Sequence, residues 1–220
     1  WRRRGLDDKT INRFGLGYAP DDGQALYQHL RDKGYNQQEL DASGLFKRSQ
    51  SGRIYCLFWR RVMTPIFDLR GNIIAFGGRV LDDSKPKYVN SPETPVFKKG
   101  RILYALHLAR QEMGKKGFAI LCEGQLDVIA MHRAGHTNTV APQGTAFTEE
   151  QATMLKRYAD GLYLAFDSDA AGTKAVFRAA ELALPRGFAL KVVRFPGGKD
   201  PDELLRNSGK EAIDEAVNGA

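Results

Sequence analysis

The pattern of apolar and polar positions changes character near residue 117. Beyond it, short apolar runs alternate with stretches whose apolar residues recur at the spacing of a helix. We predict strands at 118–124, 137–142, 162–167 and 190–195 and helices at 125–135, 148–159, 170–184 and 201–209. Strands that alternate with helices of about 10–14 residues predict a parallel sheet joined by right-handed crossovers.

The part of the chain before residue 117 mixes the two patterns. Asp7 is placed to cap a first helix, and Ala25–Gly34 has helical spacing followed by a glycine stop. Apolar runs at 53–68 and 73–80 are joined by a short turn, 70–72, and predict an antiparallel hairpin. We expect the aromatic side chains of this hairpin in the core: Phe58, Trp59, Phe67 and Phe76.

Two segments lead from the hairpin to the second half. Residues 84–100 are rich in Pro, Lys and Ser and are predicted to form a loop. Residues 102–113 have helical spacing, and the glycines and lysines of 114–117 mark a boundary. The predicted fold class is therefore α/β, with an α+β N-terminal subdomain followed by a Rossmann-like parallel sheet flanked by helices. We place the divisions at 1–116, 117–200 and 201–220, the last being the start of a helical region that the chain cuts short.

Composition narrows the class of protein. The chain has 220 residues, of which 42% are hydrophobic and 27% charged, and this is ordinary for a globular protein. It contains no apolar run long enough to span a membrane and no apolar segment near its start, so we expect neither a membrane anchor nor a signal peptide. Cys56 and Cys122 lie in apolar surroundings and indicate a reducing cytosol. Because the chain lacks an initiating Met, we expect it to be a piece of a longer protein.

The net charge of +7 is unevenly distributed. Up to Gly117 there are 22 Lys and Arg against 12 Asp and Glu, whereas from Phe118 there are 11 against 14. Basic residues often do no more than solvate a surface, so the charge alone is a weak signal. The asymmetry nevertheless favours a polyanionic partner for the first half.

Acidic residues follow the predicted strands in three clusters. They are Glu123 and Asp127, Asp167 and Asp169, and Asp200 and Asp202. The carboxyl ends of parallel strands are where ligands bind in an open α/β sheet. Two unit charges about 4 Å apart repel by roughly 4 kcal/mol at an effective dielectric of 20, so such a gathering favours bound divalent cations. Oxygen ligands of this kind suit Mg²⁺ or Mn²⁺ and point to metal-dependent phosphoryl chemistry.

Each cluster also has an ordinary structural explanation. Asp169 is placed to cap the helix that begins at Ala170, and Asp200 or Asp202 to cap the helix that contains Leu204. Asp127 either faces the same pocket as Glu123 or only favours the helix dipole. The metal interpretation depends on the three clusters converging at one edge of the sheet.

Three segments resemble the TOPRIM motifs, in which a Glu-Gly strand end is followed by a DxDxxG turn. They are LCEGQLDVIA, APQGTA, and FDSDAAGTKA followed by GGKDPDELL. TOPRIM domains occur in bacterial primases, topoisomerases, recombination-mediator proteins and some nucleases. Gln125 stands where an aromatic residue is more usual, and Pro142-Gln143 before Gly144 is also a departure. Neither departure removes a carboxylate.

A longer segment, FGGRVLDDSKPKYVNSPETPVFKKGRILYAL, resembles the RNA-polymerase core of the bacterial replicative primase of the DnaG type. The resemblance begins at RRRGLDDKTINRFGLGYAP and continues through KDPDELL, so it covers nearly the whole chain. It identifies 117–200 as a TOPRIM catalytic domain. It also implies contacts with nucleic acid or triphosphate from six residues: Arg4, Arg79, Lys87, Tyr88, Asn90 and Lys99.

The resemblance implies a DNA-dependent RNA polymerase that makes short RNA primers on single-stranded DNA. The 3′-hydroxyl of one ribonucleotide would attack the α-phosphate of the next, with two Mg²⁺ or Mn²⁺ ions, at Glu123, Asp167 and Asp169. Asp127, Asp200 and Asp202 are second choices as metal ligands, and Glu123 is an alternative general base. Implied partners are the template, ribonucleoside triphosphates and the RNA primer–DNA hybrid. A zinc-binding module and a helicase-interacting domain would lie outside this chain, and the setting would be the bacterial cytoplasm at the replication fork.

Three alternatives share the acidic motifs. They are a topoisomerase fragment, a metal-dependent nuclease, and a non-catalytic recombination-mediator-like module that only binds DNA. The KPKYVNSPET segment argues against the topoisomerase, and metal titration separates a vestigial site from an active one. His132 and His136 are not expected to form a metal pair, because Gly135 intervenes near a helix end.

Overall fold

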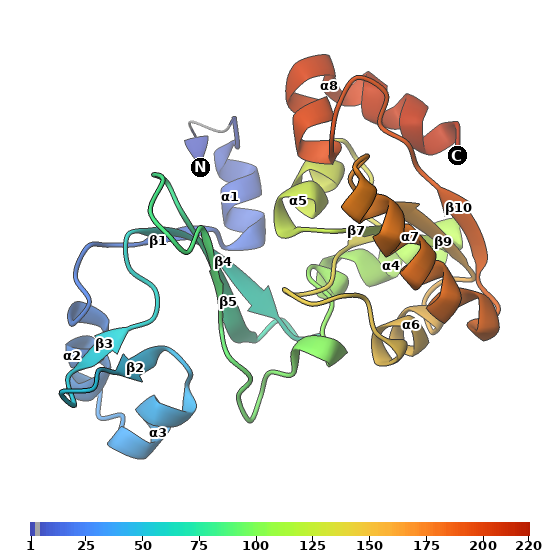
Figure 1. The fold of residues 1–220 in the computed structure, drawn as a ribbon. Coiled ribbons are helices and arrows are strands. Elements are labelled where there is room, and N and C mark those ends of the chain that lie inside the picture. The colour runs from blue at the N-terminus through green and yellow to red at the C-terminus, as the bar shows by residue number, and fades with distance from the viewer. Residues whose placement is uncertain (3–4) are drawn as a thin grey trace. The chain divides into compact units, whose positions relative to one another are not determined.

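The structure is a computed structural model that describes residues 1–2 and 5–220. The chain divides into two compact units. The N-terminal unit comprises residues 1–66 and 73–98, and the C-terminal unit comprises residues 67–72 and 99–220. Each unit contains both helices and strands (Figure 1). The mixed fold class predicted from the sequence is confirmed.

The N-terminal unit is built on a four-stranded sheet in the order β1-β4-β5-β6. These strands are β1 (Gly17–Ala19), β4 (Arg61–Phe67), β5 (Ile73–Val80) and β6 (Tyr88–Asn90). A separate two-stranded sheet pairs β2 (Phe46–Arg48) with β3 (Ile54–Cys56). The helices of this unit are α1 (Asp8–Phe14), α2 (Ala25–Asp32) and α3 (Gln37–Ala42). As predicted, Asp7 caps α1, by accepting a hydrogen bond from the backbone N of Thr10 at 2.8 Å.

The predicted hairpin is present as β4 and β5, which are neighbours in the sheet. The backbone N of Asp68 donates to the carbonyl oxygen of Asn72 at 2.9 Å and closes the turn. Gly71 adopts a φ of 88° in that turn, a conformation that glycine reaches without steric cost.

The expectation of one continuous strand over 53–68 is wrong. β3 pairs with β2, whereas β4 begins only at Arg61 and lies in the larger sheet. Arg60 has a φ of 49°, which turns the chain between the two strands. Trp59 is also not a core residue, since 46% of it is exposed. Its neighbour Phe58 is 3% exposed and packs edge-on against the Phe76 ring at 6.2 Å.

Two further boundaries differ from the sequence prediction. The segment predicted as a loop, 84–100, contains strand β6, which pairs antiparallel with β5. The helix predicted from residue 102 begins later, as α4 (Leu106–Lys116), after a 3₁₀ turn, η2 (Lys99–Arg101). Both differences arise from pairing with distant residues, which local periodicity does not record.

The C-terminal unit is built on a parallel sheet in the order β10-β9-β7-β8. Its strands are β7 (Phe118–Cys122), β8 (Thr139–Val140), β9 (Gly161–Ala165) and β10 (Ala189–Val192). The helices that follow them are α5 (Gln125–Arg133), α6 (Glu149–Lys156), α7 (Ala170–Ala183) and α8 (Pro201–Asn218), and the 3₁₀ turn η3 (Leu184–Arg186) extends α7. This is the predicted strand–helix alternation.

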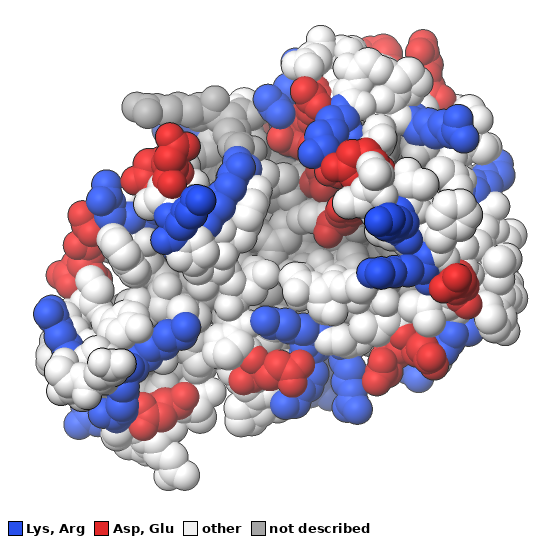
Figure 2. All heavy atoms as spheres, in the orientation of Figure 1, with Lys and Arg blue, Asp and Glu red and all other residues white. Residues whose placement is uncertain are grey.

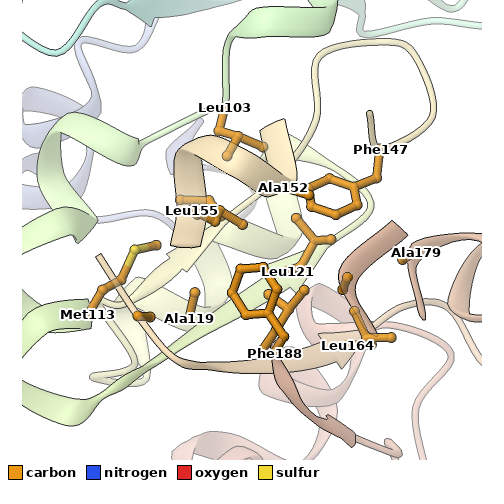
Figure 3. Packing of buried hydrophobic residues seen from close by; sticks show 14 of the residues in the cluster. Leu103, Met113, Ala119, Leu121, Phe147, Ala152, Leu155, Leu164, Ala179 and Phe188 are labelled. Atoms are coloured by element: carbon orange, nitrogen blue, oxygen red, sulfur yellow. The ribbon is translucent and has the colours of Figure 1, made fainter. Parts of the chain in front are cut away.

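The hydrophobic core of the C-terminal unit fills one face of this sheet. Ala119 and Leu121 of β7 point to that face, together with Leu162 and Leu164 of β9. Figure 3 shows side chains of α4, α6 and α7 packed against these strands. α5 and α8 pack on each other and bury Ile129 and Ile213. Each fully buried aliphatic side chain stabilises the fold by about 1.5–3 kcal/mol relative to exposure. Because this packing fixes the strands, the residues at their carboxyl ends are held in place as well.

Candidate metal centre and nucleic-acid interface

The acidic residues Glu123 and Asp167 lie side by side although they are far apart in the sequence. β7 and β9 are neighbouring parallel strands in which Cys122 is the partner of Ala165, so the residues that follow both strands leave at the same edge. Oε1 of Glu123 accepts a hydrogen bond from the backbone N of Asp167 at 3.1 Å. The structure therefore brings the first two acidic clusters together.

Asp169 is held at the start of α7. Its Oδ1 accepts hydrogen bonds from the backbone N of Ala171 and of Gly172, both at 2.9 Å, so it is the N-cap of the helix. The hydrogen bond from Gly172 is the main reason that the pKa of Asp169 lies below its usual value. Capping engages only one carboxylate oxygen, so the capping role and a ligand role are compatible.

Asp127, in the first turn of α5, is buried, and its Oδ2 accepts from the backbone N of Gly124 at 3.1 Å. Burial raises the pKa of Asp127 well above its usual value, and the charges of Asp200, Asp167 and Asp202 raise it further. These charges act on Asp127 because the three acidic clusters converge. Burial and the neighbouring charges therefore disfavour the ionised form of Asp127.

The third cluster lies at the start of α8. Asp200 caps this helix by accepting from the backbone N of Glu203 at 2.7 Å. Asp202 accepts from Nε of Arg206 at 3.2 Å. Asp200 is therefore both a structural cap and a neighbour of the buried Asp127.

Burial and mutual repulsion together raise the pKa values of Glu123 and Asp167. Burial raises the pKa of Glu123, and the charge of Asp167 adds to the increase. The pKa of Asp167 is likewise raised by burial first and by Asp200 second. In Figure 2, red acidic side chains gather where α5, α7 and the start of α8 lie together, with blue basic side chains beside them. Such a cluster attracts cations.

Gly172 allows α7 to begin this close to the acids. A Cβ atom at this position would lie 2.0 Å from the carbonyl oxygen of Asp167 and 2.9 Å from Oε1 of Glu123. No side chain fits there without moving the backbone. The glycine of the DxDxxG motif is therefore required for a steric reason, which the sequence motif alone does not reveal.

Lys199 is a site residue that sequence reasoning missed. Its Nζ lies 3.7 Å from Oδ2 of Asp167 and 3.6 Å from Oδ2 of Asp169. These two carboxylates, Asp167 more than Asp169, raise the pKa of Lys199 above its usual value. The only sequence signal of its role is that this lysine directly precedes Asp200 of the third acidic cluster.

The donor chemistry of the cluster fits a hydrated divalent ion. Within residues 1–2 and 5–220, no three His, Cys, Asp or Glu side chains are arranged to hold a metal ion together. Mg²⁺ is usually held by one or two carboxylates, with water and substrate phosphates completing its coordination. The carboxylates of Glu123, Asp167 and Asp169 converge and can supply the one or two protein ligands that Mg²⁺ needs. The ammonium group of Lys199 already lies near two of them.

The histidines of this unit have structural partners. Nε2 of His132 lies 3.0 Å from the carbonyl oxygen of Thr139, and Nε2 of His136 lies 2.8 Å from Oδ1 of Asp214. The two rings therefore do not share a metal site.

The two departures from the usual TOPRIM pattern contact each other. Nε2 of Gln125 donates to Oε1 of Gln143 at 2.8 Å. Gln143 is 1% exposed, so this hydrogen bond is inside the protein. It connects the segment after β8 to the first turn of α5, next to Glu123 and Gly124.

The N-terminal unit carries the predicted nucleic-acid residues on β5, β6 and the segment before β6. Arg79 and Tyr88 are register partners, and the Arg79 guanidinium lies 5.3 Å from the centre of the Tyr88 ring. Nζ of Lys87 lies 5.9 Å from the same ring, which is 56% exposed. Asn90 pairs with Gly77, two residue pairs further along the same ladder. Tyr88 is therefore an exposed aromatic residue with two cationic groups close to its ring.

The other two predicted contacts lie elsewhere. Arg4 is outside the described residues. Lys99 belongs to the C-terminal unit, where its carbonyl oxygen accepts from Nε2 of the buried Gln151 at 3.1 Å. The structure thus places four of the six residues together, on one edge of the N-terminal sheet.

Arg61 supports this edge and was not identified from the sequence. It is buried, and its guanidinium donates to the carbonyl oxygens of Pro86 at 2.9 Å and Lys87 at 3.3 Å. Burial is the main reason that the pKa of Arg61 lies below its usual value, although the charge of Asp82 opposes that shift. An arginine inside an apolar run gave no signal of this role.

The chain matches two known protein families. Residues 1–110 match the family described as DNA primase catalytic core, N-terminal domain, and residues 120–205 match the Toprim-like family. A DNA primase of Clostridium acetobutylicum is 46% identical over 218 residues, covering 99% of this chain and 36% of that protein. The chain thus spans about a third of the length of the curated relatives that it matches.

Solved structures agree with this assignment. The E. coli primase catalytic core has a TM-score of 0.90 and 39% identity, covering 100% of this chain and 71% of that chain. A structure described as the DnaG primase catalytic domain bound to ssDNA has a TM-score of 0.89 and 39% identity, covering 100% of this chain and 69% of that chain. In the part of this chain that the structure describes, no helix combines the length and apolar character needed to cross a membrane.

Proposed function

Because this chain belongs to the DNA primase catalytic core family, we propose that it contains the nucleotidyl-transfer centre of an enzyme that makes RNA primers on single-stranded DNA. The observation that carries the proposal is the contact between Glu123 and the backbone of Asp167, which joins the acidic ends of two parallel strands. Of the alternatives with the same acidic motifs, family membership argues against the topoisomerase fragment and the nuclease.

In this proposal, Glu123, Asp167 and Asp169 hold Mg²⁺ or Mn²⁺, with two ions expected, and Asp127, Asp200 and Asp202 support them. When bound, such ions supply positive charge to the attacking and leaving oxygens of the phosphoryl transfer. Asp169 is suited to this role because helix capping leaves its Oδ2 available. The 3′-hydroxyl of one ribonucleotide attacks the α-phosphate of the next, and pyrophosphate leaves. Glu123 is an alternative general base, since partial burial and the charge of Asp167 raise its pKa above the usual value.

The N-terminal unit supplies the nucleic-acid surface in this proposal. The exposed ring of Tyr88 offers a stacking platform for a base, and the nearby Arg79 and Lys87 offer charge for the backbone of the nucleic acid. Asn90 and Lys99 are proposed contacts of the same kind. The relative described as bound to ssDNA supports a single-stranded template as the ligand.

The wider setting is also a proposal, because the chain spans only part of its relatives. Ribonucleoside triphosphates and the RNA primer–DNA hybrid would be further ligands. A zinc-binding module and a helicase-interacting domain would belong to the longer protein, at the replication fork. We retain 1–116, 117–200 and 201–220 as its functional divisions.

A primer-synthesis assay with ribonucleotides, Mg²⁺ and single-stranded DNA tests the proposal. Asp167→Asn and Asp169→Asn should each reduce synthesis by about 10²- to 10³-fold, by analogy with removal of a transition-state electrostatic group, while template binding persists. Asp160→Asn is the matched control, because this aspartate is exposed and pairs only with Lys156 among the described contacts. Full synthesis by either site variant would refute the metal assignment.

One observation favours a second candidate, a module that binds DNA and carries vestigial acids. In the described residues the carboxylates do not form a ready three-ligand cage. A titration with Mn²⁺ separates the two candidates, because vestigial acids would bind the ion no better than the Asp167→Asn variant does.

A further inference from the structure

Lys199 lies where a cation would bind, and we propose that its ammonium group competes with divalent ions for Asp167 and Asp169. An ion would bind there only after the ammonium group leaves. Lys199 would thereby set the metal concentration at which the site fills. This inference rests on the proposed function, since it takes these carboxylates to be metal ligands.

The geometry places the ammonium group between two oxygens. Nζ lies 3.7 Å from Oδ2 of Asp167 and 3.6 Å from Oδ2 of Asp169. Oδ1 of Asp169 already accepts two backbone hydrogen bonds at the start of α7. The oxygen of Asp169 that remains for a cation is therefore the one that faces Lys199.

The backbone of Lys199 is anchored beside the acidic turn. The backbone N of Ser168 donates to the carbonyl oxygen of Lys199 at 3.0 Å. The backbone N of Lys199 donates to Oε2 of Glu203 at 2.8 Å. Lys199 is thus joined on one side to the Asp167–Asp169 turn and on the other to the first turn of α8, so its side chain starts next to the carboxylates.

The head of the side chain is free to move away. Its side chain is 55% exposed, and lysine carries its charge on a flexible four-carbon stem. Ion pairs with this degree of exposure are individually weak. An incoming divalent ion, which carries twice the charge, can therefore displace the ammonium group into water without unfolding the turn.

The competition gives Lys199 two opposing effects. Without metal, the ammonium group reduces the repulsion between the two carboxylates and stabilises the fold. With metal, the same group must be displaced, so it weakens the apparent affinity of the ion. A lysine that served only as a structural ion-pair partner would produce the first effect without the second.

The test is a titration of the full chain with Mn²⁺, without nucleotide or template. Electron paramagnetic resonance measures the concentration of the unbound ion at each point. Lys199→Gln should lower the Kd for Mn²⁺ by about threefold to tenfold, since it removes two weak ion pairs. Lys199→Arg keeps the charge and should bind within about twofold of the unmodified chain, because an exposed positive charge there still competes.

Lys210→Gln is the matched control. Lys210 is 57% exposed and its Nζ lies 3.9 Å from Oδ2 of Asp214, so the substitution removes an equivalent exposed pair away from the predicted ligands. Its Kd should remain within about twofold of the unmodified chain, as exposed pairs contribute little. Thermal unfolding provides a second readout. Without metal, Lys199→Gln should have a lower Tm than the unmodified chain. Adding Mn²⁺ should then raise the Tm of Lys199→Gln by more than it raises the Tm of the unmodified chain.

The outcomes separate this inference from the function on which it rests. Mn²⁺ binding that Asp167→Asn abolishes but Lys199→Gln leaves unchanged would overturn the competition alone. Equal tightening in Lys199→Gln and Lys199→Arg would also overturn it, because the charge would then be irrelevant. If neither the unmodified chain nor Lys199→Gln binds Mn²⁺, the metal assignment fails together with the competition.

Discussion

The two units of the chain place their charged side chains by different means. In the C-terminal unit, adjacent parallel strands end at one edge of the sheet, so the backbone alone brings Glu123 next to Asp167. In the N-terminal unit, a buried side chain, Arg61, fixes the backbone from which Lys87 and Tyr88 extend. The first arrangement depends on sheet geometry and close backbone packing, and the second depends on a buried guanidinium group in addition to the pairing of β6 with β5.

This difference predicts how each region fails. The acidic site should be most sensitive to changes that push its backbone segments apart. The aromatic and basic edge should be most sensitive to loss of the group that supports it. Substitutions of the exposed residues themselves should have smaller and more local effects.

Gly172→Ala should have the largest effect. Its Cβ would meet the Asp167 carbonyl oxygen at 2.0 Å, so the turn and the start of α7 must shift. We expect a loss of about 2–4 kcal/mol in the free energy of unfolding, which is in the range of severe overpacking, together with loss of Mn²⁺ binding. Urea unfolding and metal titration measure the two effects.

Gly114→Ala provides the control for this prediction. Gly114 lies within α4, and a Cβ there would have no atom within 4 Å. Alanine should stabilise the helix by about 0.5–1 kcal/mol. Equal destabilisation by the two substitutions would show that the close approach at Gly172 is irrelevant.

Arg61→Met should have the next largest effect, confined to the N-terminal unit. The substitution leaves the carbonyl oxygen of Pro86 without its donor, at a cost of about 1–3 kcal/mol, whereas the carbonyl oxygen of Lys87 still accepts from the backbone N of Val80 at 3.1 Å. We expect weaker binding of single-stranded DNA with unchanged Mn²⁺ affinity.

Arg60→Met is the control, because Arg60 is half-exposed and its ion pairs with Asp21 and Asp82 are longer than 3.6 Å. Equal loss of DNA binding in both variants would contradict the supporting role of Arg61.

Asp127→Asn should stabilise the metal-free protein at neutral pH. The pKa of Asp127 is raised in the folded state, so the folded protein binds this proton more tightly than the unfolded chain does. Stability is therefore lost as the pH rises from the ordinary aspartate range through the raised pKa, and the penalty persists above it. Asparagine keeps an oxygen for the Gly124 amide and should remove this component of the pH dependence. Unfolding curves measured from acid to neutral pH should diverge between the two proteins, and parallel curves would refute the prediction.

Lys87→Ala should have the smallest effect. We expect a few-fold loss of affinity for single-stranded DNA and a slope of log affinity against log salt that is shallower by about 0.7, the value for one contact with a single strand. Lys47→Ala, an exposed lysine on β2, should leave that slope unchanged. An unaltered slope for Lys87→Ala would remove this residue from the interface.

The comparison of the two units also explains what the sequence could predict. The strands and helices of the C-terminal unit follow from periodicity, and the cap at Asp169 follows from residue type. Parallel strands with these connections leave few topologies, so convergence of the acids could be expected from the pattern. The position of Lys199 could not be expected, because a contact with a residue distant in sequence, the hydrogen bond from the backbone N of Ser168 to its carbonyl oxygen, holds it beside the acidic turn.

The N-terminal unit was harder to predict for the same physical reason. Its apolar run over 53–68 is divided between two sheets, and only the pairing of β3 with β2 and of β4 with β1 reveals the division. Trp59 and Phe58 are neighbours of similar character, yet only Phe58 is buried. Arg61 belongs to a residue type that is rarely buried, so composition argued against its position.

Anomalous diffraction from crystals soaked in Mn²⁺ tests the central claim most directly. The account predicts a manganese peak within about 2–2.3 Å of carboxylate oxygens of Glu123, Asp167 or Asp169, the distance expected for a hard divalent ion, with Nζ of Lys199 moved away from both aspartates. A well-ordered site without such a peak, or manganese bound only elsewhere in the molecule, would contradict it.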